Sequence, residues 1–172
     1  MQIDGQPVGV ALDQYYLSEA LNNDSSADGS IMIVVATDAP LSDRNLYRLA
    51  KRAMGGVART GASLTNGSGD YVIAFSTAEA LRRSEKESTH LAPSLSNNEV
   101  SPLFQAVIEA TEEAIYNSLL MAEDVDGHRG KTQALPIDKV KALLGQEAAT
   151  NCKRLTSYAL YRLSFYRRAH PE

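Results

Sequence analysis

The fold of this protein is decided by the stretch Asp28-Gly29-Ser30-Ile31-Met32-Ile33-Val34-Val35-Ala36. The part after Ser30 is a continuous apolar run rich in β-branched side chains, which is typical of a central strand covered on both faces. The polar run 22–29 comes directly before it and is typical of an exposed, flexible connector. The abrupt change at Ser30 therefore predicts a junction between a connector and a buried sheet.

A helix and a second strand are predicted on the carboxyl side of this strand. Ser42 is the expected N-cap, and apolar residues then recur at helical spacing until Thr60-Gly61 ends the helix. The glycine-rich loop 66–70 leads into residues 71–76, a second candidate for a buried strand. We therefore expect the helix to pack on the sheet and the loop to lie at the mouth of the sheet.

The next part of the chain is predicted to be a long surface excursion followed by helices. Residues 79–100 are polar and rich in breakers of regular structure. Ser101 is an expected N-cap with proline at the first helical position, and it begins a long amphipathic helix. After a turn at 126–130, residues 136–144 predict a short helix that Gly145 ends. The alternation of strands and helices predicts an α/β chain.

The composition is that of an ordinary soluble globular chain. The 172 residues are 44% hydrophobic and 22% charged, which suits one domain. The longest aliphatic run is far shorter than the ~20 residues of a membrane span, and Met1–Val10 has no basic n-region, so neither a span nor a signal peptide is expected. The single cysteine, Cys152, excludes an internal disulfide and a cysteine-based metal cluster and fits a cytoplasmic location.

Charge is distributed unevenly along the chain. Residues 146–172 carry five Lys and Arg against two Glu, a net +3, whereas residues 1–145 carry 12 basic and 19 acidic residues, a net −7. Basic and apolar side chains interleave in the tail at roughly helical spacing, which predicts a basic, loosely amphipathic helix. A solvated helix is favoured over a nucleic-acid-binding arm, because the acidic body would repel phosphate.

Gly29-Ser30 is the first candidate for chemistry. Before a buried strand, this pair is most simply a turn. The functional interpretation is an autoproteolytic junction, because glycine tolerates the strained backbone that brings its own carbonyl under attack by the next hydroxyl. Cleavage would expose Ser30 with a free α-amino group of pKa about 8, which can act as the base for the neighbouring Oγ nucleophile.

The loop 66–70 is the second candidate. Its Asn-Gly and Ser-Gly pairs are common turn dipeptides, so a connection between helix and strand is the simplest interpretation. Functionally, the small residues around Asn66 and Gly67 let the backbone approach a substrate, which makes these two residues candidates for substrate binding. Ser68 offers a hydroxyl relay, and Asp70 offers a carboxylate that orients or balances an amine.

The histidines lie in polar or terminal segments, without the carboxylate spacing of a metal site. We therefore expect solvent-exposed side chains, and neither a metal centre nor a Ser-His-Asp triad, at His90, His128 and His170. No metal or organic cofactor is expected, because the chemistry proposed for the serine needs only a hydroxyl, an amine and a dipole that receives the oxyanion.

Several blocks of sequence follow one another in a recognisable order. They are Asp28-Gly29-Ser30-Ile31 running into residues 34–41, then residues 58–61, 66–70, 74–78, 101–104 and 110–115. In this order they closely resemble the DmpA-like L-aminopeptidase/D-esterase and β-peptidyl aminopeptidase family. The match extends back to residues 3–9 and forward to about Gly145, and residues 146–172 lie outside it.

The resemblance implies an enzyme that is made as one precursor, cleaves itself before a serine and folds as an αββα sandwich. Carried over to this sequence, cleavage falls between Gly29 and Ser30, and Ser30 becomes the nucleophile. Ser68 and Asp70 assist from the adjacent loop, where some members of the family carry Glu in place of Asp70. The reaction implied is hydrolysis of N-terminal residues from peptides, amino-acid amides or esters through an acyl-serine intermediate.

The resemblance also implies a part of the fold that this sequence lacks. The family's precursor has a long segment upstream of the position that matches Met1, which supplies central strands, the asparagine of the oxyanion hole and much of the substrate pocket. Residues 1–29 are then the end of the part before the cleavage site, residues 30–145 the catalytic part, and residues 146–172 a basic extension. Whether the chain acts alone stays open, since it fits a fragment, a truncated reading frame or a subunit with a complementary chain.

Other functions compete with this hypothesis. A non-catalytic domain that forms oligomers or binds a partner is favoured by the absent upstream half and by the basic tail, whose Arg and Tyr residues suit an acidic surface. The intact set of Gly29-Ser30, Ser68 and Asp70 favours the enzyme. A relative of ornithine acetyltransferase would share the architecture but use threonine, so the serine at position 30 argues against it.

Overall fold

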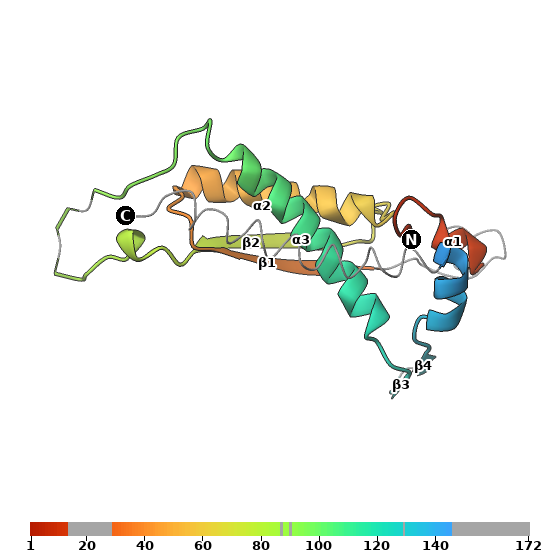
Figure 1. The fold of residues 1–172 in the computed structure, drawn as a ribbon. Coiled ribbons are helices and arrows are strands. Elements are labelled where there is room, and N and C mark those ends of the chain that lie inside the picture. The colour runs from red at the N-terminus through yellow and green to blue at the C-terminus, as the bar shows by residue number, and fades with distance from the viewer. Residues whose placement is uncertain (14–28, 87, 90, 129, 146–172) are drawn as a thin grey trace.

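The computed structural model describes residues 1–13, 29–86, 88–89, 91–128 and 130–145. In chain order these residues form α1 (Val8–Ala11), β1 (Ile31–Thr37), α2 (Asp43–Arg59), β2 (Asp70–Ser76), the short 3₁₀ helix η2 (Glu79–Leu81), α3 (Ser101–Leu120), β3 (Val125–Gly127) and β4 (Gly130–Thr132). A further helix covers residues 137–145 (Figure 1). The expected polar connector falls largely outside the described residues, as do Cys152 and the expected basic helix over 146–172.

The two long strands form a parallel pair that α2 connects. β1 runs beside β2 in a register that begins with Ile31 opposite Asp70 and ends with Thr37 opposite Ser76. Parallel strands require a crossover between their ends, and α2 supplies it. The predicted strand–helix–strand order is therefore confirmed, and the starts of both strands lie at the same edge of the sheet.

A local side-chain cap sets the start of α2 but not the start of α3. α2 begins as predicted, because the Ser42 Oγ accepts a hydrogen bond from the Asn45 N–H at 3.3 Å. In α3 the expected N-cap is wrong: Val100 is the N-cap and Ser101 is already helical. Val100 is buried in the core, so packing rather than a side-chain cap sets the start of this helix.

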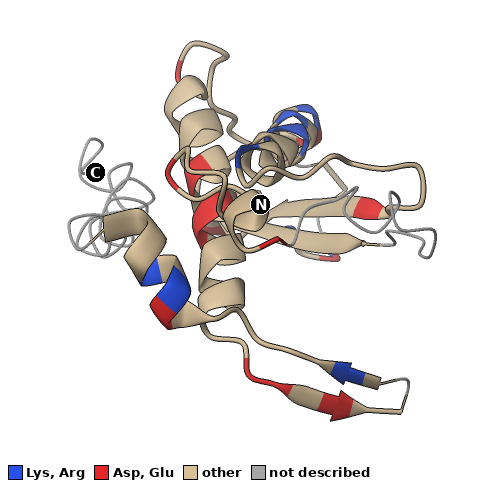
Figure 2. Ribbon diagram, turned by 90° about the vertical axis from the view of Figure 1, so that its right-hand side faces the viewer, with Lys and Arg blue, Asp and Glu red and all other residues tan. Residues whose placement is uncertain are grey.

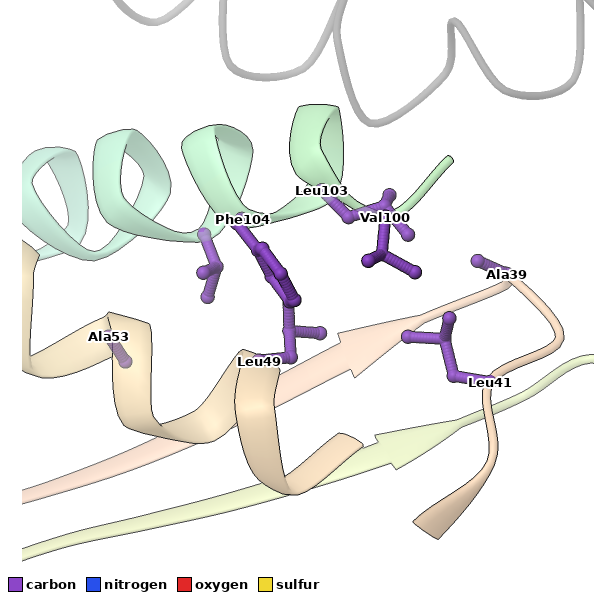
Figure 3. Close-up of a cluster of buried hydrophobic side chains, with 8 residues drawn as sticks. Ala39, Leu41, Leu49, Ala53, Val100, Leu103 and Phe104 are labelled. Carbon is purple, nitrogen blue, oxygen red and sulfur yellow. The ribbon is translucent and has the colours of Figure 1, made fainter. Parts of the chain in front are cut away.

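Both long helices lie on the same face of the β1–β2 sheet (Figure 1). α2 and α3 contact each other, and α2 also contacts β2. Inward-facing residues Ile33 and Val35 of β1 and Val72 of β2 pack against this helical layer. Figure 3 shows its buried cluster, in which Phe104 reaches from α3 toward Leu49 of α2. The full buried cluster is Ala39, Leu41, Leu49, Ala53, Val100, Leu103, Phe104 and Val107.

The opposite face of the sheet is apolar but exposed. Met32 is 63% exposed and Val34 is 62% exposed, because both helices cover the other face. The prediction of a central strand covered on both faces is thus wrong for the described structure, in which burial alternates along β1. The side chains of this exposed face are Met32, Val34, Tyr71, Ile73 and Phe75. We call them the open sheet face.

A smaller cluster joins the first residues of the chain to the carboxyl half of α3. Ile3, Val8, Tyr116 and Val140 form its buried core. The Tyr116 hydroxyl donates to Glu112 Oε1 at 3.0 Å, and burial together with this carboxylate raises the tyrosine pKa well above its usual range. The cluster therefore ties residues 1–12 and the helix over 137–145 to α3.

The β3–β4 hairpin projects away from the helices and the sheet (Figure 2). Its strands pair in antiparallel register, and Lys131 Nζ lies 3.0 Å from Asp126 Oδ2. The predicted turn at 126–130 therefore connects the two strands of a hairpin. Along the described residues, no helix has both the length and the apolar character that crossing a membrane requires.

Candidate active site

The loop after α2 brings the predicted residues to the start of β2. The Ser68 N–H donates to the Thr65 carbonyl at 2.9 Å, which closes a turn whose two central residues are Asn66 and Gly67. Asn66 and Gly67 are exposed at this turn. The structure therefore gives the Asn-Gly pair the local role of a turn.

Ser30 lies directly beside this loop although Gly69 is 39 positions further along the chain. The Gly69 N–H donates to Ser30 Oγ at 3.1 Å, and the Ile31 N–H donates to the Gly69 carbonyl at 3.3 Å. Both bonds follow from the parallel register, which aligns the starts of β1 and β2. The Ser30 hydroxyl is thus held at the edge of the sheet by a backbone donor.

Ser68 and Asp70 form a hydrogen-bonded pair. The Ser68 Oγ donates to Asp70 Oδ1 at 2.7 Å, a short distance that is typical of a bond to a charged acceptor. The two residues are only two positions apart at the entry to β2, which keeps their side chains within hydrogen-bond reach. The carboxylate can take up a proton that passes through the hydroxyl.

These side chains share one cavity of about 330 Å³. Gly29, Ser30, Ser68 and Asp70 all line it. Its other walls come from the end of α2, from the loop that follows and from α3, and they include Val57, Leu64 and Ile115. The structure therefore brings the candidate cleavage site and the Ser68–Asp70 pair together, and leaves Asn66 and Gly67 outside the lining.

A second cavity, of about 230 Å³, lies between β1 and α3. Aliphatic residues line most of it, and among the described lining residues the hydroxyls belong to Thr37 and Thr111. The Thr111 hydroxyl donates to the Val107 carbonyl at 2.7 Å. The part of the chain that the structure describes places no acid, base or amine in this lining, so we do not assign hydrolytic chemistry to the cavity.

Sequence reasoning missed several residues of the site. In the sequence Gly69 is one loop glycine among others, although its N–H contacts the Ser30 Oγ. Val57 and Ile115 occur at core-facing positions of predicted helices, and nothing in the sequence marks them as cavity residues. Leu64 belongs to no recognisable sequence motif. Of the histidines, His128 is exposed in the turn between β3 and β4, and His90 and His170 fall outside the described residues.

The sequence profile of peptidase family S58 matches residues 1–133. The chain belongs to this family. Two proteins named beta-peptidyl aminopeptidase BapA are similar to it: one from Sphingosinicella microcystinivorans is 40% identical over 154 residues, and one from Sphingosinicella xenopeptidilytica is 35% identical over 117 residues. These matches cover 84% and 67% of this chain but only 39% and 29% of the respective relatives.

Solved structures of similar proteins match the fold of this chain. The L-aminopeptidase D-Ala-esterase/amidase from Ochrobactrum anthropi matches with a TM-score of 0.70 and 32% identity over 86% of this chain and 39% of its own. A protein from Pyrococcus horikoshii OT3 matches with a TM-score of 0.70 and 43% identity over 84% of this chain and 38% of its own. A Burkholderia beta-aminopeptidase matches with a TM-score of 0.62 and 34% identity over 74% of this chain and 37% of its own.

The Ochrobactrum enzyme represents a variant of the Ntn-hydrolase fold. The α/β fold expected from the sequence, as one part of a larger sandwich, is therefore confirmed. The described sheet with its two covering helices matches part of that fold, and the chain spans about two fifths of the solved structures that it resembles.

Proposed function

We propose that this chain carries the self-cleaving nucleophile of an aminopeptidase that removes N-terminal residues from peptides, amino-acid amides or esters. One observation carries the proposal: the Ser30 Oγ is hydrogen-bonded to the same loop that holds the Ser68–Asp70 pair, and these groups line one cavity. Membership of family S58 and the similarity to named aminopeptidases support the reaction class.

The first step is processing of the chain itself. The Ser30 Oγ attacks the Gly29 carbonyl carbon, so that an ester bond forms as the Gly29–Ser30 peptide bond breaks and the Ser30 nitrogen becomes a free amine. Water then hydrolyses the ester and releases the Gly29 carboxylate. The product is a new amino terminus at Ser30, with its amine and its hydroxyl on neighbouring atoms of one residue.

The second step is turnover. The Ser30 α-amine, whose pKa is about 8 as a free terminal amine, accepts the Oγ proton while Oγ attacks the substrate carbonyl. The leaving amine takes that proton, and water hydrolyses the acyl-Ser30 ester. The Gly69 N–H orients the Oγ, and the Ser68–Asp70 pair provides a hydroxyl and a carboxylate for proton movement.

Turnover is tested with an L-aminoacyl amide and its N-acetyl derivative. An aminopeptidase hydrolyses the first and leaves the second intact, because the free amine is part of what it recognises. Release of ammonia is measured with the full chain and with the Ser30→Ala variant. Absence of Ser30-dependent release, or equal release from both amides, contradicts the proposed function of this chain.

Removing the Ser68–Asp70 pair is expected to slow both steps. Ser68→Ala and Asp70→Asn should each reduce the rate of self-cleavage and of hydrolysis about a hundredfold, the scale of positioned acid–base assistance. Rates are measured from intact-mass time courses and from ammonia release. Ser118→Ala, which removes an exposed hydroxyl of α3 outside the cavity, is the matched control and should change neither rate. Equal rates in all variants contradict the assigned role.

A second candidate function, binding of a partner, has its own observation in the open sheet face. Contiguous exposed apolar surface of this kind marks interfaces, and both long strands contribute large apolar side chains to it. We propose that this face is covered by a second copy of the chain. An interface on this face is compatible with the proposed aminopeptidase function, because the match to this chain covers only 39% of a related aminopeptidase.

Polar substitution on the open sheet face is expected to reduce self-association. Val34→Thr combined with Ile73→Thr removes exposed apolar surface while keeping β-branched side chains that suit a strand. Sedimentation velocity should then show a lower average mass than for the unsubstituted chain at equal concentration. Leu91→Thr, at a position that is 97% exposed in an irregular segment, is the control. If the control lowers the mass equally, the face is not the interface.

A further inference from the structure

Leu64 combines two features that are unfavourable for a leucine. It lies in the loop after α2 with φ of +48° and is 45% exposed. The left-handed region disfavours a residue with a branched side chain, and the partial exposure of Leu64 limits the compensation that burial can give. The remaining non-glycine residues with positive φ in the described part of the chain are Asp4 and Asp13, a residue type that tolerates this conformation.

Leu64 is one of the residues that line the cavity beside Ser30. It shares this cavity with Val57 from α2 and Ile115 from α3, which are also aliphatic. Residues held in unfavourable backbone conformations are frequent at ligand-binding sites, where the side chain is needed in one place. The loop therefore places a partly exposed leucine with an unfavourable backbone conformation beside the nucleophile, where it can make an apolar contact with a substrate.

The charges around the cavity restrict what it can accept. Asp70 is the only charged residue that lines it among the described residues. Arg59, near the end of α2, is held by Glu112, with 3.2 Å between Nη1 and Oε2. A carboxylate on a substrate side chain would thus meet the Asp70 carboxylate and no cationic side chain among the described lining residues, whereas a neutral aliphatic group could contact Val57, Leu64 and Ile115.

We propose that Leu64 is a specificity-determining residue, which with Val57 and Ile115 forms a subsite for an aliphatic side chain next to the bond that Ser30 attacks. This inference rests on the proposed function, because it takes the cavity as the substrate site. The chemical class of substrate is an aminoacyl amide or peptide with a neutral, branched aliphatic side chain.

The test measures binding and not turnover. L-Leucinamide and glycinamide are titrated by calorimetry into the full chain carrying Ser30→Ala, which cannot consume them. L-Leucinamide should bind about tenfold more tightly than glycinamide, the scale of discrimination for a small apolar pocket. Adding Leu64→Asn should reduce this preference to about threefold or less while it raises the melting temperature by about 2 °C, because asparagine tolerates both the backbone conformation and exposure.

Opposite effects on binding and on stability separate a binding role from a purely structural one. Leu64→Gly should behave in the same way, since glycine also accepts the left-handed conformation. Leu91→Asn, the same substitution at an exposed leucine outside the cavity, should change neither the preference nor the melting temperature.

Equal binding of the two amides, absence of binding, or an unchanged preference in the Leu64→Asn chain overturns the inference. A failure of the proposed function gives a different result. In that case the unsubstituted chain shows no hydrolysis, although the Ser30→Ala chain still binds leucinamide more tightly than glycinamide. Conversely, Ser30-dependent hydrolysis without a preference for leucinamide leaves the proposed function in place and removes the subsite.

Discussion

A Ser30→Ala chain is expected to stay one uncut polypeptide, whereas the unsubstituted chain separates into residues 1–29 and 30–172. Alanine at this position removes the only group that the proposed first step uses to attack the Gly29 carbonyl. The measurement is an intact-mass spectrum under denaturing conditions, in which the two pieces appear as separate masses. Ser30-dependent hydrolysis of aminoacyl amides should fall by about a thousandfold or more, as expected when a covalent nucleophile is lost.

Ser30→Cys is the matched variant for this prediction. It keeps a nucleophile of similar size, since a thiolate can attack the same carbonyl. Cleavage should therefore persist in the cysteine chain and disappear in the alanine chain. Separation of the alanine chain into the same two pieces would assign the cut to another agent. A single uncut mass for the unsubstituted chain would contradict self-processing by this polypeptide.

Gly56→Ala is expected to destabilise the protein by about 2 kcal/mol or more, because α2 and α3 touch at this glycine. A Cβ atom there would lie 2.6 Å from the Ile108 carbonyl oxygen and 2.6 Å from the Thr111 Cβ. It would also lie 3.0 Å from the Glu112 backbone nitrogen. Two of these atoms belong to the backbone of α3, so no side-chain rotation relieves the contact and the helices must separate.

Gly55→Ala is the control for this prediction, since it makes the same substitution at the adjacent residue of α2. A Cβ at Gly55 would come no closer than 3.4 Å, to the flexible Ile108 side chain. Replacing a helical glycine without a clash should stabilise the chain by about 0.5–1 kcal/mol. The midpoints of urea unfolding should thus move in opposite directions, and equal shifts would contradict the proposed close packing.

The helix contact also bears on the cavity. Val57 follows Gly56 directly in α2, and Ile115 lies one helical turn after Thr111 in α3, and both side chains line the cavity beside Ser30. Separation of the helices at Gly56 therefore changes the distance between two walls of the site. Hydrolysis by the Gly56→Ala chain should fall even at a temperature where the chain remains folded, whereas the Gly55→Ala chain keeps its rate.

The sequence by itself determined the features that depend on a few neighbouring residues. Ser42 caps α2 because its hydroxyl and the Asn45 N–H are close in any helix that starts there. The pair Ser68–Asp70 joins residues that are only two positions apart, so it forms within one short segment of the chain. The residue pattern, together with the resemblance to a known family, is therefore enough to name Ser30, Ser68 and Asp70 as candidates.

Only the tertiary structure decided the features that depend on distant residues. The contact between Ser30 and Gly69 requires the parallel register of β1 and β2, which arises from burial of both strands against α2 and α3. The exposure of Met32 follows from which face the helices cover, since a continuous apolar strand suits either face. The place of Leu64 in the cavity has the same origin: the packing of α2, the loop and α3 set it, and no local pattern encodes it.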